Sequence, residues 1–183
     1  MEIIPTAVDG VVEIRPPRHG DDRGWFSEVY RRHTLRDAGI DIEFVQDNES
    51  FSAPVGTLRG LHYQLPPHAQ DKLVRVIHGS ILDIAVDIRR GSATFGQHVA
   101  ITLTAELGNQ LLVPAGFAHG FSTLEPDTRV AYKVSDVWVP DVERAIRWDD
   151  PALRIDWQLP PDGPTLSGKD AVAPLLADQP ELF

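Results

Sequence analysis

Short apolar runs separated by glycine and proline fill the middle of the chain. They are rich in β-branched residues, and a glycine follows most of them. The runs cover residues 73–77, 81–88, 98–104 and 110–113. Short runs at a spacing of roughly ten residues are typical of an antiparallel sandwich or barrel. The pattern therefore predicts an all-β core.

The N-terminal part of the chain carries weaker signals. Two short apolar runs, at residues 3–4 and 11–14, are broken by proline and glycine and predict strands or strand edges. Residues 31–38 are compatible with a helix, and Gly39 is placed to end it. This is the one helix that the pattern predicts in the first half of the chain.

The C-terminal part continues the β pattern and then loses it. Strands are predicted over residues 128–135 and near residues 137–139. Residues 160–183 are rich in proline, glycine and aspartate, and we expect them to form a tail that covers the core. No repeat or linker divides the chain, so residues 1–183 are predicted to form one all-β domain with a few short helices.

Composition and charge narrow the class of function. Hydrophobic residues make up 42% of the 183 residues, which is enough for a sizeable core. The formal net charge is −10, which argues against a binder of nucleic acids or membrane surfaces, because such proteins need a basic face. An anionic ligand would have to be bound by a local cluster of arginine, lysine and histidine.

The residue types also limit covalent and metal chemistry. Cysteine is absent, which excludes disulfides, thiolate metal sites and cysteine nucleophiles. Residues 1–9 lack the pattern of a secretory signal, and no apolar stretch approaches the roughly 18 residues of a membrane span. We therefore expect a cytoplasmic protein.

One dense polar cluster contains candidate chemistry. Arg59, His62, Gln64 and Lys72 lie close together in the sequence, on a predicted strand, turn and strand. Alternate residues of a strand share a face, so His62 and Gln64 are expected to point to one side and Tyr63 to the other. The cluster supplies a candidate base and cationic groups for an anion.

A second histidine raises the question of a metal. His119 lies between small residues in the segment 114–121, where a ligand could approach the backbone. A metal site in a β-barrel usually takes a His-x-His pair and a glutamate from its first motif. Here that motif reads His-Tyr-Gln from His62, and no glutamate follows before Gly79. We therefore predict that no metal is bound.

Motifs along nearly the whole chain are similar to those of one known family. They cover residues 22–28, 46–50, 58–64, 72–76, 118–121, 148–151 and 166–170. In this order they resemble the dTDP-4-dehydrorhamnose 3,5-epimerase family of nucleotide-sugar epimerases. The resemblance runs from about residue 3 to about residue 175 and implies a cupin-type jelly-roll β-barrel.

The resemblance also implies a reaction and four catalytic residues. A 4-keto group acidifies the hydrogens on C3 and C5 of the sugar, but a base must remove them and the enolate must be stabilised. His62 matches the base, and Asp170 matches the carboxylate that fixes its tautomer and stabilises the imidazolium. Lys72 would stabilise the oxyanion at O4, and Tyr132 matches the acid on the opposite face. The ketone itself supplies the acidity, so no cofactor is expected.

A further set of residues is implied to bind the dTDP-sugar. They are Arg23, Phe26, Glu28, Gln46, Asn48, Arg59, His119, Trp138, Glu143 and Lys169. Guanidinium groups can donate paired hydrogen bonds to phosphate, which suits Arg23 and Arg59 to the diphosphate. Trp25, Phe26 and Trp138 are candidates for stacking on thymine, and Trp138 stands where the family more often has tyrosine. Family members are homodimers that exchange N-terminal strands, so residues 23–48 are expected to complete the partner's site.

The function expected from this resemblance is conversion of dTDP-4-dehydro-6-deoxy-D-glucose to dTDP-4-dehydro-L-rhamnose. One alternative is an epimerase that inverts only C3 or only C5 in an antibiotic-sugar pathway, or a related 3,4-isomerase. Another is a cupin that binds a nucleotide sugar without catalysis. At the level of single residues, Asp170 could instead cap the turn at residues 171–176, and His119 could support its loop.

Overall fold

Strands make up most of the computed structural model, which describes Met1–Phe183. In chain order the elements are β1 (Glu2–Pro5), β2 (Val12–Arg15), β3 (His19–Asp21), β4 (Gly24–Phe26), α1 (Arg32–Asp37), β5 (Gln46–Ser52), β6 (Leu58–Gln64), β7 (Lys72–His78), β8 (Ser80–Asp87), β9 (His98–Thr104), β10 (Gln110–Val113), β11 (Phe117–Thr123), β12 (Thr128–Val134), the 3₁₀ turn η1 (Pro140–Val142), β13 (Glu143–Ala145), α2 (Gly168–Ala171) and the 3₁₀ turn η2 (Leu176–Asp178). Both helices are short, as the sequence predicts.

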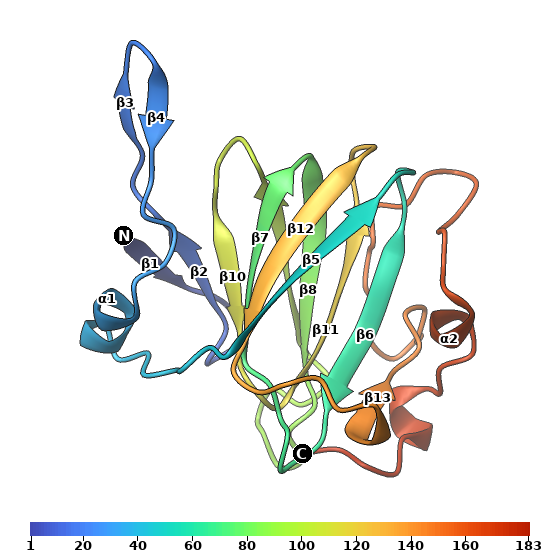
Figure 1. The fold of residues 1–183 in the computed structure, drawn as a ribbon. Helices are drawn as coiled ribbons and strands as arrows, with labels where there is room; N and C mark the ends of the chain where they lie inside the picture. Colours follow the sequence, from blue (N-terminus) through green and yellow to red (C-terminus); the bar gives the residue numbers. More distant parts are fainter.

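Two antiparallel sheets pack face to face to form the barrel (Figure 1). One has the strand order β1-β2-β10-β7-β12-β5, and the other has the order β13-β6-β11-β8-β9. From β5 to β8, and again from β9 to β12, each strand lies in the other sheet from the strand before it. Within each of these two series, consecutive strands therefore lie on opposite sides of the barrel.

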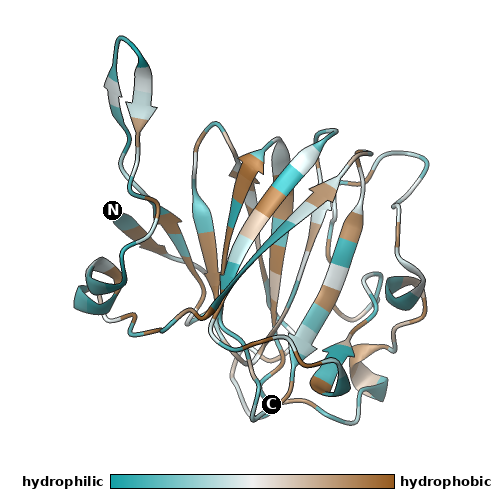
Figure 2. Ribbon diagram, viewed as in Figure 1, coloured by the Kyte–Doolittle hydropathy of each residue, from teal (hydrophilic) through white to brown (hydrophobic).

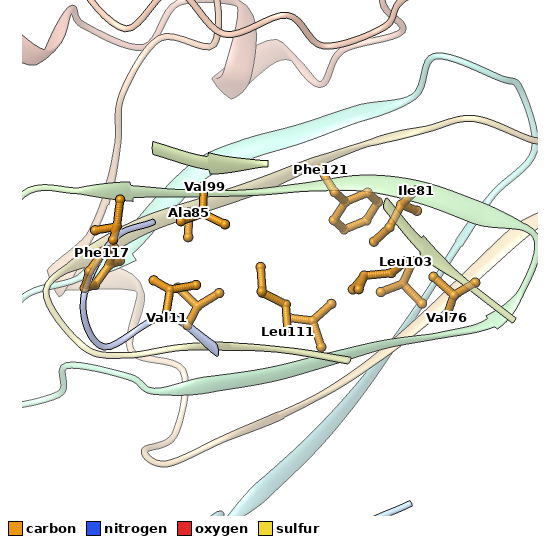
Figure 3. Packing of buried hydrophobic residues seen from close by; sticks show 13 residues of the cluster. Val11, Val76, Ile81, Ala85, Val99, Leu103, Leu111, Phe117 and Phe121 are labelled. Atoms are coloured by element: carbon orange, nitrogen blue, oxygen red, sulfur yellow. The ribbon is translucent and has the colours of Figure 1, made fainter. Parts of the chain in front are cut away.

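The interior between the sheets is an apolar core. It includes Ile81 of β8, Leu103 of β9, Leu111 of β10 and Phe121 of β11, whose side chains point toward one another (Figure 3). Burying each such side chain contributes about 1.5–3 kcal/mol. The core makes the two sheets a rigid frame for the polar groups on the same strands.

The outer face of the five-stranded sheet is covered by the chain that follows β13. All residues of β8 are buried, because Ile84 and its neighbours pack outward against Ile146, Trp157 and Leu176. The predicted covering tail is thus confirmed, although the covering residues begin earlier than residue 160. A strand buried on both faces reads as a nearly continuous apolar run, which is the pattern of residues 81–88.

The outer face of the six-stranded sheet is covered only in part. Leu35 of α1 packs there against Ile14, Leu73 and Leu112. Farther along this sheet β12 carries both hydrophilic and hydrophobic residues (Figure 2), and its Arg129 is exposed. The hairpin β3–β4 belongs to neither sheet and extends away from the barrel (Figure 1).

Most of the predicted elements are confirmed, and one is wrong. Strands β7 to β10 and β12 lie on the predicted runs, and α1 lies within the predicted helix. The strand predicted near residues 137–139 is not formed, because the Val137 carbonyl and the Val139 N–H bond to the side chain of Gln64 rather than to a strand. Strands β3, β4, β5, β11 and β13 were not predicted, since polar residues and glycine interrupt their apolar pattern. No helix is both long and apolar enough to cross a membrane.

Candidate active site

A cavity of about 440 Å³ lies between the two sheets. Eleven of the predicted site residues line it, namely Gln46, Asn48, Arg59, His62, Lys72, His119, Tyr132, Trp138, Glu143, Lys169 and Asp170. Ser50, Gln70, Phe121 and Ser167 complete the lining. The structure thus gathers residues that lie far apart in the sequence into one polar site.

The sheets hold the proposed base and acid on opposite walls of this cavity. His62 lies on β6 and His119 on β11, in the five-stranded sheet. Lys72 and Tyr132 lie on β7 and β12, in the six-stranded sheet. Asp170 belongs to neither sheet, because the tail brings it to the cavity on α2.

The His62–Asp170 pair has the geometry of an oriented base. Nε2 of His62 lies 2.6 Å from Oδ1 of Asp170, and the hydroxyl of Ser167 donates to Oδ2 at 2.7 Å. Burial raises the pKa of Asp170, but the hydrogen bonds from His62 and Ser167 outweigh it and lower that pKa below its ordinary value. An ionised carboxylate only accepts hydrogen bonds, so Nε2 carries a proton and Nδ1 is the basic nitrogen of the neutral ring.

The alternative role for Asp170, as a cap of the turn at residues 171–176, is wrong. Ser167 is the N-cap of α2, and its side chain accepts a hydrogen bond from the Asp170 N–H. The side chain of Asp170 instead bridges Ser167 and His62.

A second histidine–aspartate pair lies beside the first. His119 is the cross-strand partner of His62, and its Nε2 lies 2.7 Å from Oδ1 of Asp83 on β8. Asp83 is fully buried, and its Oδ2 has no hydrogen-bond partner. Sequence reasoning missed Asp83, although a carboxylate inside the apolar run at residues 81–88 was a signal.

Two glycines let β6 and β11 come close beside these histidines. A Cβ atom on Gly60 would lie 2.5 Å from the Cα of Gly120, and the φ of Gly60 is +135°. Both conditions exclude other residues, because an L side chain would clash and would be strained at that φ. The register between the strands shifts at this point, between His119 and Phe121.

Two cations without a carboxylate partner give the cavity a local positive character. Arg59 bonds to the Ser52 hydroxyl and the Phe51 carbonyl, and Lys72 Nζ lies 3.4 Å from the His62 carbonyl. Burial lowers the pKa of Lys72 to about 8, although Glu143 and Asp83 oppose that shift. Lys72 is therefore mostly protonated at neutral pH, and an anion can bind here despite the net charge of −10.

The remaining polar groups of the site are a phenol and an ion pair. Burial raises the pKa of Tyr132, so its hydroxyl keeps its proton at neutral pH. Glu143 lies 2.9 Å from the ammonium of Lys169. Burial raises the pKa of Glu143, but Lys169, His62 and the side chain of Trp138 together lower it below the ordinary value.

Three predicted residues lie outside the cavity of this chain. Arg23 and Phe26 are exposed on the hairpin β3–β4, where Arg23 pairs with Asp21. Glu28 lines a second cavity of about 570 Å³, together with residues on the outward-facing side of β7 and β12, including Arg75.

The expectation that residues 23–48 complete the partner's site is wrong for the last residues of this segment. Gln46 and Asn48 line the cavity of their own chain. The reason is that β5 pairs with β12 along its whole length, with Asn48 opposite Tyr132, so their side chains enter the same barrel.

No group of three or more histidine, aspartate and glutamate side chains lies close enough together to hold a metal ion. The amide that stands in place of the second ligand, Gln64, instead bonds to backbone groups of neighbouring loops.

Comparison with other proteins finds the same family across nearly the whole chain. Residues 5–178 match the profile of the dTDP-4-dehydrorhamnose 3,5-epimerase family. A dTDP-4-dehydrorhamnose 3,5-epimerase from Sinorhizobium fredii is 51% identical over 172 residues, covering 93% of this chain and 87% of that protein.

Solved structures agree with the sequence comparison. The dTDP-6-deoxy-D-glucose-3,5-epimerase of Legionella pneumophila, in complex with dTDP-4-keto-L-rhamnose, is 46% identical with a TM-score of 0.92, covering 97% of this chain and 93% of that chain. A 3′-monoepimerase from Streptomyces bikiniensis, in complex with dTDP-quinovose, is 35% identical with a TM-score of 0.87, covering 95% of this chain and 87% of that chain. The fold is therefore the cupin-type jelly roll implied by the sequence motifs.

Proposed function

This chain belongs to the dTDP-4-dehydrorhamnose 3,5-epimerase family, and we propose that it inverts C3 and C5 of dTDP-4-dehydro-6-deoxy-D-glucose to give dTDP-4-dehydro-L-rhamnose. It is an isomerase of the carbohydrate epimerase class. The observation that carries the mechanism is the placement of His62 and Tyr132 on opposite walls of one cavity. Inversion at carbon requires a base on one face and a proton donor on the other.

The first step is removal of a proton next to the ketone. Nδ1 of His62 takes the proton from C3 or C5, and the electrons of that C–H bond form a C=C bond while O4 becomes an enolate oxygen. The hydrogen bond to Asp170 stabilises the imidazolium that results, because that carboxylate is ionised.

Lys72 stabilises the negative charge that develops on O4. Lys72 reaches into the cavity from β7, in the sheet opposite His62, and its ammonium has no carboxylate partner to neutralise it. A fixed cation in a site of low dielectric constant stabilises an oxyanion more strongly than water does. The ketone and Lys72 together provide the acidity, so the reaction needs no cofactor.

Tyr132 returns a proton to the opposite face of the sugar carbon. Its raised pKa keeps the phenol protonated until the enolate is present. When the C–H bond forms, the enolate electrons reform the ketone and the phenol becomes a phenolate. Proton exchange with solvent then restores His62 and Tyr132 for the second centre.

The remaining lining residues bind the nucleotide in this proposal. Arg59 suits the diphosphate, because its guanidinium has no carboxylate partner within the chain. Gln46, Asn48, His119, Glu143 and Lys169 line the same cavity, and Trp138 is the one tryptophan among its walls.

Assembly as a homodimer with exchanged N-terminal strands is part of the same proposal. It is supported by the hairpin β3–β4, which carries Arg23 and Phe26 away from the cavity of their own chain (Figure 1). In a symmetric pair, each hairpin could reach the cavity of the other chain. We further propose that residues 1–183 act as one domain and that the enzyme is cytoplasmic.

Mixing two inactive variants tests the exchange. Arg23→Ala and His62→Ala are each expected to be inactive alone. Unfolding and refolding them together should restore about a quarter of the activity, because half of the dimers are mixed and each of these has one intact site. No recovery from refolded dimers would contradict the exchange, and a monomer by light scattering would contradict the dimer.

Proton NMR in deuterated water tests the reaction itself. The substrate dTDP-4-dehydro-6-deoxy-D-glucose is incubated with the enzyme, and the product is trapped by a reductase. Deuterium at both C3 and C5 with the L-lyxo configuration is the expected result. Deuterium at C3 alone would assign the chain to the single-centre epimerases, and no exchange by folded protein that binds dTDP would leave only a binding role.

A further inference from the structure

Gln64 is a buried amide whose hydrogen bonds all go to backbone groups of neighbouring loops. Its Nε2 donates to the carbonyl of His68 at 2.7 Å and to the carbonyl of Val137 at 3.1 Å. Its Oε1 accepts from the N–H of Val139 at 2.7 Å. Gln64 is only 3% exposed, whereas the loop residues that it bonds are partly exposed.

Two of these contacts lie on either side of one residue, Trp138. The carbonyl that precedes Trp138 and the N–H that follows it are both bonded to Gln64. Residues 137–139 belong to no strand and no helix, so no ladder of backbone bonds holds them. One other side chain, that of Gln46, accepts from the Trp138 N–H, at 3.4 Å.

Trp138 itself lines the cavity close to the carboxyl group of Glu143. Its side chain is 56% exposed, yet it lies at the cavity wall beside Glu143 and lowers the pKa of that carboxyl. An indole that is half exposed on an irregular loop has few packing contacts of its own, so its position depends on how the loop is fixed.

We propose that Gln64 is a positioning residue for the epimerisation site, which fixes the Trp138 indole at the cavity wall by bonding to both peptide groups that flank it. The proposal rests on the proposed function. His62 and Gln64 are two residues apart on β6, so one strand places both the base and the support of this aromatic wall.

The bonds of Gln64 are difficult to replace. Substitution by methionine keeps the length of the side chain and removes its donors and its acceptor. The carbonyls of His68 and Val137 and the N–H of Val139 would then lose their partner, and the partly exposed loop could move toward water to replace these bonds. The predicted consequence is a mobile Trp138 with an intact barrel.

A double-mutant cycle between Gln64→Met and Trp138→Phe tests the proposal. Gln64→Met is expected to lower kcat/KM about tenfold, which corresponds to about 1.4 kcal/mol. In the Trp138→Phe background the same change should lower kcat/KM less than about twofold, because the indole is absent and the smaller phenyl ring leaves less of the cavity wall for Gln64 to position. Equal losses in both backgrounds would overturn the proposal.

Tryptophan fluorescence gives a second readout that needs no turnover. The emission of Trp138 is obtained as the difference between the chain with and without Trp138→Phe. Gln64→Met should shift this emission to the red and lower its anisotropy, and unchanged emission would overturn the proposal. If the wild-type chain does not epimerise the sugar, the proposed function fails while this measurement still decides the role of Gln64.

A matched control and a milder variant separate positioning from loss of folding. Gln179→Met removes another buried amide, whose Nε2 donates to the carbonyl of Ala145 at 3.0 Å. This variant should leave the Trp138 emission unchanged, and its effect on kcat/KM should be the same with and without Trp138→Phe. If Gln64→Met does not fold, Gln64→Glu, which keeps the acceptor for Val139 and loses both donors, replaces it in the same cycle. A thermal melt by circular dichroism establishes that each variant is folded.

Discussion

Two histidine–aspartate pairs lie side by side in this barrel, and their surroundings differ. The His62–Asp170 pair joins β6 to the tail, and the His62 side chain is 21% exposed to the cavity. The His119–Asp83 pair joins two neighbouring strands of one sheet, and its side chains are 9% and 0% exposed. The nitrogen–oxygen distances, 2.6 Å and 2.7 Å, are nearly the same.

The comparison shows that the pairing alone does not define a base. Both carboxylate oxygens of Asp170 are bonded, so the His62 ring is fixed and still accessible to a substrate. One oxygen of Asp83 has no partner, and this carboxylate acts on Lys72 by raising its pKa. We therefore expect the first pair to transfer protons, and the second to hold the wall and keep the Lys72 ammonium charged.

Replacement of each histidine is the strongest test of this difference. His62→Asn should lower kcat by about 10²–10⁴-fold, because a general base contributes that much, while dTDP still binds in calorimetry. His119→Asn should lower kcat by about tenfold or less, since it removes a wall residue and not the base. An equal loss of kcat in the two variants would remove the distinction between the pairs.

Replacement of each aspartate by asparagine is expected to give the next largest effect. In Asp170→Asn the amide can donate to Nε2 of His62, which favours the tautomer in which Nδ1 carries the proton and cannot act as a base. We expect kcat to fall by about 10²–10³-fold, as is typical when an orienting carboxylate is lost. Asp83→Asn should cost about tenfold or less at pH 7. Steady-state kinetics of the two variants measures both, and the reverse order would contradict the assignment.

The pH dependence of kcat tests the effect of Asp83 on Lys72. The pKa of Lys72 is lowered to about 8, so kcat should fall as the pH rises through about 8 and the ammonium loses its proton. Because the charge of Asp83 opposes that lowering, Asp83→Asn should move the alkaline fall to lower pH. A profile of kcat from pH 6 to 10 checks this, and an unshifted profile would show that Asp83 does not act on Lys72.

The smallest expected effect concerns the hydroxyl that supports Asp170. Ser167→Ala removes its hydrogen bond to Oδ2, and such a bond contributes about 1 kcal/mol, so kcat should fall about fivefold. The pKa of Asp170 should also rise, so activity should be lost at a higher pH on acidification than in the wild type. Ser80→Ala is the matched control, because it removes a 2.6 Å bond from a serine to the carboxylate of Glu125 and should leave kcat unchanged.

Sequence reasoning found the residues that stand out from their surroundings. His62, Lys72 and Tyr132 are polar residues on strands with an apolar inner face, and the family motifs include His62 and Lys72. The all-β architecture was also predictable, because the runs from residue 73 to residue 113 are short, β-branched and separated by glycine.

Other features depend on pairing that a linear pattern does not contain. Asp83 and Asp87 interrupt the same apolar run, yet Asp83 bonds to His119 while Asp87 accepts from Arg89, Ser92 and Thr94. The register between β8 and β11 sets His119 opposite Ala85, two residues from each carboxylate, so only the folded structure tells the two carboxylates apart.

The two errors have the same origin. The false strand at residues 137–139 arose because a side chain, Gln64, satisfies its backbone groups. The misplacement of Gln46 and Asn48 arose because the pairing of β5 with β12 decides which cavity they enter.

The position of Asp170 along the chain has a consequence for synthesis. All the strands of the barrel precede it, whereas α2 and its carboxylate follow β13 by more than twenty residues. A ribosome therefore delivers His62, Lys72 and Tyr132 first, in a barrel without the anion that orients its base. Nascent chains therefore contain every strand before they contain the carboxylate that orients the base, and full activity requires the tail.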